Sequence, residues 1–174
     1  YEMSRRREQG ADATWANAFD VFKAPAIGGI FALGFMLVLL FLAWLAAAWI
    51  IYAWTLGPTA PTSLDAFAHD VFLTPAGWTM IVVGVGVGFL FALLAMAISV
   101  VSFPLLIDRD VGLDTAIQTS IRAVKQNPVP MAAWGLIVAA ALVLGSIPLF
   151  IGLVAVVPTL GHATWHLYLR LVSI

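Results

Sequence analysis

The chain has 174 residues, of which 63% are hydrophobic and only 10% are charged, and its net charge is -1. Its mean hydropathy of +1.03 lies far above that of soluble domains. We therefore expect an integral membrane protein with a single membrane domain. Because one transmembrane helix needs about 20 apolar residues, the chain has room for about three to five spans.

The same composition excludes several classes of function. Nucleic-acid binding depends on clustered Lys and Arg, which a chain with 8 basic and 9 acidic residues does not supply. The absence of cysteine excludes thiolate metal sites, iron–sulfur clusters and a cysteine nucleophile. No P-loop, HExxH or nucleophile-elbow motif is present. We expect no enzymatic activity, no catalytic residues and no bound cofactor.

The N-terminal third predicts a short helix followed by a membrane span. Trp15, Phe19 and Phe22 recur at helical spacing with polar residues on the other face, which indicates an interfacial helix over residues 12–24. Residues 26–56 contain no charge and are long enough to form the first span. Residues 57–76 are rich in proline and turn formers, so we expect the chain to leave the membrane there and return.

The predicted second span, residues 77–107, contains the glycine-rich sequence GVGVG. A phosphate-binding loop would have to follow a strand and open the helix of a soluble domain, and this context excludes it. Gly84, Gly88 and Ala92 instead follow the small-xxx-small spacing that lets another helix approach closely. We expect them to form a helix-packing or partner-binding face.

A charged segment, DRDVGLDTAIQTSIRAVKQNP, follows this span. It predicts a cytoplasmic amphipathic helix over residues 111–126, with Gly112 as its N-cap. Its apolar residues recur about one helical turn apart. They are Leu113, Ile117, Ile121 and Val124. Two interpretations remain open: a connector whose apolar stripe lies in the membrane interface, and a docking surface for a partner protein.

The same segment carries a polar cluster that we expect at the inner face of the membrane. Asp108, Arg109 and Asp110 are consecutive, and Arg122 lies on the amphipathic helix. Paired carboxylates can act as acid and base when burial separates their pKa values. An adjoining arginine at a membrane surface favours an ion cluster that anchors the end of a helix.

The last apolar run, residues 129–157, is too long for one span and is interrupted at GSIP, residues 145–148. We expect a third span over residues 129–145 and a fourth over residues 148–170, joined by a tight hairpin. With a cytoplasmic N-terminus, four spans place all 8 basic residues on the cytoplasmic side. The predicted fold is all-α, with four transmembrane helices, two amphipathic interfacial helices and both termini cytoplasmic.

The sequence GHATWHLYLR near the C-terminus places His162 and His166 four residues apart, on one face of a helix. Ionisable side chains at membrane depth are uncommon and often functional. We expect them to form interhelical hydrogen bonds, for example with Ser99, Ser102 or the Asp108 cluster, and we expect no metal site. Two aromatic neighbours are typical of interfacial anchors: Trp165 and Tyr168.

The segments FPLLIDRDVGLDTAIQTSIRAVKQNP and GHATWHLY resemble a bacterial family of predicted multi-pass integral membrane proteins of unknown function. Some members are labelled as cytochrome c oxidase subunits. A broader similarity exists to the membrane domains of glycerophosphodiester phosphodiesterases. The resemblance covers nearly the whole chain and implies a location in the bacterial inner (cytoplasmic) membrane, but it brings no catalytic residues. With only 3 histidines in the chain, it implies an accessory subunit rather than the catalytic subunit of an oxidase.

The leading hypothesis is a non-catalytic accessory, assembly or stabilising subunit of a larger membrane complex, in particular a respiratory cytochrome c oxidase. One alternative is a small transporter or lipid-handling membrane protein, although the predicted spans offer no charge at the midplane for a polar pathway. The other is a haem-binding or metal-binding protein that uses His162 and His166.

Overall fold

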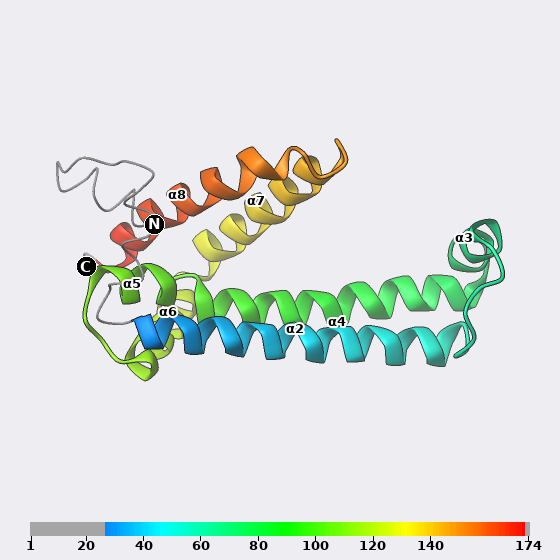
Figure 1. Ribbon diagram of the computed structural model, residues 1–174, viewed down its shortest axis with the longest axis horizontal. Coiled ribbons are helices and arrows are strands. Elements are labelled where there is room, and N and C mark those ends of the chain that lie inside the picture. The colour runs from blue at the N-terminus through cyan, green and yellow to red at the C-terminus, as the bar shows by residue number, and fades with distance from the viewer. Residues whose placement is uncertain (1–26, 173–174) are drawn as a thin grey trace. The chain divides into compact units, whose positions relative to one another are not determined.

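The computed structural model describes residues 27–172, and within this range the chain forms helices and no strand (Figure 1). The predicted interfacial helix over residues 12–24 lies outside the described residues. Three helical segments of the described chain are long and apolar enough to cross a membrane: Ile27–Thr55, Pro75–Asp108 and Pro128–Ser146. The all-α class and the membrane-protein character expected from composition are confirmed.

The chain divides into two compact units. The described part of the first unit comprises residues 27–34 and 96–172, and the second unit comprises residues 35–95. Two long helices, α2 (Ile27–Thr55) and α4 (Pro75–Ser99), each run from one unit into the other.

The second unit consists of the apolar parts of α2 and α4, which lie side by side, and of α3 (Leu64–Leu73) in the connection between them (Figure 1). Both long helices are hydrophobic around their whole circumference, the pattern of a helix surrounded by lipid or protein. Their large apolar side chains are mostly exposed on the isolated chain. The surface of this unit is therefore suited to hydrocarbon, not to water.

Helix α3 occupies part of the 57–76 segment, where we expected the chain to leave the membrane and return. Ser63 caps it by accepting a hydrogen bond from the backbone N–H of Ala66 at 3.1 Å, and Asp65 lies in its first turn, where a negative charge is favourable. Thr74 then ends α3, and its side chain accepts a hydrogen bond from the Gly77 N–H at 3.0 Å. The prolines of the segment flank residues 64–73 without interrupting them, so the segment contains a capped helix.

The predicted second span is an interrupted helix. Helix α4 ends at Ser99 and α5 (Ser102–Asp108) begins after two intervening residues. Pro104 explains the position of the break. Its nitrogen carries no hydrogen to bond the carbonyl oxygen of Val100, and its ring crowds that preceding turn. The helix resumes only where Leu105 N–H bonds the carbonyl of Val101 at 3.0 Å.

Two serines close the break, and both are fully buried, with 0% exposure. The backbone N–H of Val101 donates to Ser120 Oγ at 3.2 Å. Ser102 Oγ lies 2.6 Å from the Ile98 carbonyl oxygen and 3.1 Å from that of Ala116, so one hydroxyl proton serves two carbonyls. Side-chain hydroxyls thus replace the backbone bonds that the interrupted helix lacks.

Helix α6 (Leu113–Gln126) supplies Ser120 and Ala116 to this junction and packs against α5. Gly112 is its N-cap residue, in an extended conformation. Its buried positions are Ala116, Ser120 and Ala123, whose small side chains allow close approach. The predicted apolar stripe lies beside this small-residue face and is only half-buried. Its residues are Leu113, Ile117, Ile121 and Val124.

A single residue, Asn127, separates α6 from α7 (Pro128–Ser146). Pro128 cannot continue α6 and disfavours a helical conformation at the residue before it, but it suits the first position of a new helix. Asn127 donates both its backbone N–H and its side-chain amide to the Ala123 carbonyl, at 3.1 and 3.0 Å. The chain therefore changes direction sharply without leaving these groups unpaired.

Helices α7 and α8 (Leu153–Val172) pack against each other as a hairpin (Figure 1). The fourth helix was predicted to begin at residue 148, and this boundary is wrong. Leu149 and Phe150 have φ angles of 50° and 66°, a left-handed conformation that cannot form part of a right-handed helix. Gly145 and Gly152 face each other at the start of the hairpin, where a side chain on either would meet the opposite segment.

A methyl group at Gly145 tests this close approach. Its carbon would lie 2.9 Å from Leu153 Cδ2 and 3.1 Å from Val156 Cγ2, so Gly145→Ala should lower the free energy of unfolding by about 1–3 kcal/mol. The matched control is Gly161→Ala, which has open space around it and should be neutral or stabilising by up to about 1 kcal/mol. Reversible unfolding in mixed detergent and SDS micelles measures both. Equal effects of the two substitutions would contradict the packing described.

The buried serine junction gives a second test. Ser120→Ala leaves the buried Val101 N–H without its acceptor and should cost about 1–3 kcal/mol of unfolding free energy. Thr119→Ala removes a neighbouring hydroxyl that bonds only within its own helix, at 2.8 Å to the Thr115 carbonyl, and should cost less than about 0.5 kcal/mol. The same unfolding measurement compares them, and a Thr119 effect as large as that of Ser120 would refute the role of the junction.

Candidate functional site

The last turns of α8 meet the end of α5, and this is where the structure gathers the polar groups of the first unit. Asp108 is the final residue of α5, and Arg109 follows it in an extended conformation. Tyr168 Oη donates a hydrogen bond of 2.7 Å to Asp108 Oδ2, and Arg109 Nε lies 3.7 Å from the same oxygen. The Asp108 carboxylate therefore accepts a hydrogen bond from the Tyr168 hydroxyl and forms an ion pair with the Arg109 guanidinium.

Tyr168 and Trp165, which we expected to anchor α8 in the membrane interface, are instead buried side chains, each 1% exposed. Their rings pack against each other with centroids 5.4 Å apart. The expectation was wrong because this part of α8 packs against α5 rather than presenting its aromatic face outward. A buried tyrosine hydroxyl requires a partner, and Asp108 supplies it.

The opposite face of α8 is an exposed polar stripe, called the α8 stripe below. Its members follow helical spacing and comprise Thr159, His162, His166 and Arg170. Helix α8 is accordingly absent from the described segments that are apolar enough to span a membrane by themselves. The helix is therefore two-sided, with aromatic residues packed inside and ionisable residues outside.

The two histidines of the stripe converge on each other. Their Nε2 atoms are 3.2 Å apart, the ring centroids are 4.6 Å apart, and the ring planes cross at 86°. A hydrogen bond at this distance requires one ring to present N–H and the other a lone pair. Of the candidate partners named from sequence, Ser102 is engaged by backbone carbonyls and Asp108 by Tyr168. The bond from α8 to Asp108 is thus made by the tyrosine.

The remaining members of the predicted polar cluster lie at the surface. Arg109 and Asp110 are exposed beside the half-buried Asp108, and Arg122 is exposed on α6. The groups that the structure brings into contact are therefore Asp108, Arg109 and Tyr168. Tyr168 lies one helical turn beyond Thr164 and Trp165, which are also buried, so the three residues share the inward face of α8.

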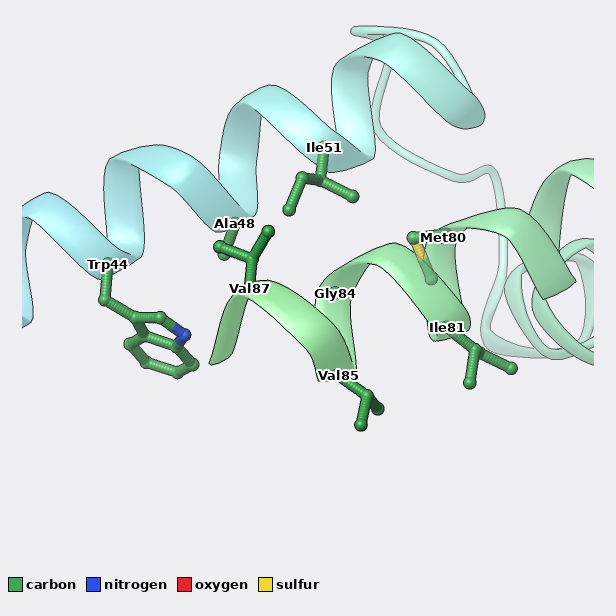
Figure 2. Close-up of a pocket in the computed structure, with 8 residues that line it drawn as sticks. All are labelled: Trp44, Ala48, Ile51, Met80, Ile81, Gly84, Val85 and Val87. Atoms are coloured by element: carbon green, nitrogen blue, oxygen red, sulfur yellow. The ribbon is translucent and has the colours of Figure 1, made fainter. Parts of the chain in front are cut away.

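The predicted glycine face lies along the second unit. Gly84 borders an apolar groove of about 330 Å³ between α2 and α4 (Figure 2). A side chain at Gly88 would reach ordinary contact distance, 3.6 Å, from Trp44 Nε1 of α2, whereas Ala92 is exposed. The groove is lined by Trp44, Ala48, Ile51, Met80, Ile81, Gly84, Val85 and Val87. Gly88 therefore faces a helix of the same chain, whereas a side chain at Gly84 would meet no atom within 4 Å.

The sequence profile of a family described as "Predicted integral membrane protein (DUF2189)" matches residues 1–108, which is more than half of the chain. The chain belongs to this family. The match includes α2 to α5 and ends at Asp108, so α6, α7 and α8 lie beyond it. No curated protein and no solved structure matches the chain.

Within the described residues, no three His, Cys, Asp or Glu side chains come together as a ready-made metal site. His162 and His166 also cannot hold a haem iron from its two sides. Ligands on opposite sides of an iron are about 4 Å apart with the porphyrin between them, whereas these two Nε2 atoms lie 3.2 Å apart on successive turns of one helix. A ligand that binds both rings must therefore contact the two Nε2 atoms from the same side.

The contact between α8 and α5 can be tested by a double-mutant cycle. Tyr168→Phe removes the hydroxyl that donates to Asp108 and should lower the free energy of unfolding by about 1–2 kcal/mol. Combining it with Asp108→Ala should cost less than the sum of the two single effects, because both remove the same bond. Tyr52→Phe is the control, since Tyr52 bonds the Thr59 carbonyl at an exposed position. Strict additivity at Tyr168 and Asp108 would disprove the bond.

Proposed function

We propose that this protein is a non-catalytic four-span subunit that stabilises or assembles a larger complex in the bacterial inner membrane. We suggest a respiratory cytochrome c oxidase as this complex, because some proteins that the sequence resembles are labelled as its subunits. Membership of an integral membrane protein family agrees with this proposal. The observation that carries it is a set of helical glycines that nothing in the described chain contacts.

These glycines lie at Gly28 and Gly34 on α2 and at Gly86 on α4, and a side chain at each would meet no atom within 4 Å. A glycine in a helix is less favourable than alanine by about 1 kcal/mol. Membrane helices offset that cost where a second helix packs closely against the small residue. Because no described helix of this chain does so at these positions, a helix of another protein is the natural partner.

Three observations support the four-span topology. Helices α7 and α8 have 19 and 20 residues, each about 30 Å long, which matches the thickness of the hydrocarbon core. The hydrogen bond from Tyr168 to Asp108 places the end of α8 beside the end of α5, so both ends lie at the same side of the membrane in this proposal. With Asp108 at the cytoplasmic surface, the basic residues of the described chain fall on that side, as the positive-inside rule favours. They are Arg109, Arg122, Lys125 and Arg170.

A transport role receives no comparable support. Helices α2, α4 and α7 carry no charged residue, and the groove in the second unit is lined by apolar side chains. Moving a polar substrate across a bilayer requires a polar path between helices near its midplane, and among the described spans α8 alone carries ionisable side chains at that depth. The subunit role explains the apolar surface and the uncontacted glycines together.

The test is purification of the tagged chain from native membranes in a mild detergent, with partners identified by mass spectrometry. We expect large membrane subunits, those of a cytochrome c oxidase first among them, to be recovered with it. Gly86→Leu should reduce that recovery several-fold by blocking the approach of a helix. Val85→Leu, which enlarges a side chain that is 68% exposed and lies about 100° around the helix from Gly86, should change it little.

Two outcomes would count against the proposal. One is a chain that remains stable and alone in mild detergent. The other is a partner whose recovery is unaffected by leucine at each of the uncontacted glycines, since packing at those positions is the basis of the argument.

A further inference from the structure

The proposed subunit role does not involve the side chains of the α8 stripe. Its two histidines are exposed on the described chain, so an ion could reach them. Ionisable groups are costly against hydrocarbon, so this face of α8 meets water or polar groups. Imidazole is the commonest protein ligand for transition metals, and it binds through a nitrogen lone pair.

The separation of the two rings matches that of two ligands on one metal ion. Zn²⁺ binds imidazole nitrogen at about 2.0–2.1 Å with tetrahedral geometry, which places two such nitrogens about 3.3–3.4 Å apart. The Nε2 atoms of His162 and His166 are 3.2 Å apart before any ion is bound. The spacing of four residues along α8 sets this distance, because the two side chains project from adjacent turns of one face.

We propose that His162 and His166 bind one divalent transition-metal ion, such as Zn²⁺, through their Nε2 atoms. The ion replaces the hydrogen bond between the two rings and takes both nitrogen lone pairs. The described residues supply two protein ligands on an exposed face, one fewer than an open catalytic zinc site, so water completes the coordination. The site requires no partner protein, so its test is independent of the subunit role.

The first experiment uses the full chain in mild detergent, purified with a tag that contains no histidine and stripped of metal with a chelator. Zn²⁺ binding is measured by competition with a chromophoric chelator. We expect one Zn²⁺ per chain. His162→Ala and His166→Ala should each weaken binding about tenfold or more, because one of two nitrogen ligands is lost.

The chain offers a matched control in His69. This histidine lies on α3, is 64% exposed, and has Asp70 3.6 Å away, so it too is a histidine with a second potential ligand beside it. His69→Ala should leave Zn²⁺ affinity unchanged. Equal weakening by His69→Ala would overturn the assignment, as would wild-type binding no tighter than that of the double variant His162→Ala, His166→Ala.

A second readout needs no substitution. Cu²⁺ added at one equivalent to the wild-type chain should give an electron paramagnetic resonance spectrum with hyperfine coupling to two imidazole nitrogens. A spectrum with one nitrogen or none would overturn the proposal even if every variant folded poorly.

Discussion

The interruption of the helical backbone at Val100 and Val101 is the constraint on which the first unit depends. A helix satisfies its own backbone groups, but Pro104 removes the N–H that would bond the Val100 carbonyl. Unpaired backbone groups are costly wherever water is absent. Helix α4 ends at Ser99, so the Val101 N–H has its acceptor outside that helix, in the hydroxyl of Ser120 on α6. The charged segment that follows α4 is held against the break by this requirement, with alanines on either side of the serine to permit the approach.

The position of α5 in turn determines that of α8. Because α5 ends at Asp108, a half-buried carboxylate is available to the buried hydroxyl of Tyr168. That bond and the packing of Trp165 fix which face of α8 turns inward. The opposite face must then carry His162 and His166. The exposed position of the histidine pair thus follows from the same break in the helix. The break positions α5, and the hydrogen bond from Tyr168 to Asp108 at the end of α5 orients α8.

Composition and periodicity were sufficient to predict an all-helical membrane protein, because both report on how much apolar surface the chain must place in lipid. They could not predict features that depend on contacts between distant residues. The burial of Tyr168 requires a carboxylate sixty positions earlier in the sequence. The late start of α8 reflects left-handed backbone at Leu149 and Phe150, two residues whose side chains give no signal for it. Helix α3 begins at a cap formed by Ser63. The prolines on both sides of this helix made the segment resemble a loop in the sequence.

The two kinds of surface on this chain impose different demands on its surroundings. Around Gly34 and Gly86 the helices are apolar, so lipid can cover them, and a partner helix gains mainly by close packing. The α8 stripe is different, because a pair of imidazoles and an arginine facing hydrocarbon would be strongly unfavourable. If α8 crosses the bilayer, protein or trapped water must cover that face. A metal ion coordinated by both rings would satisfy their lone pairs but would add charge, which increases the need for a polar cover. The histidine pair therefore constrains any partner: the surface that meets α8 must itself be polar.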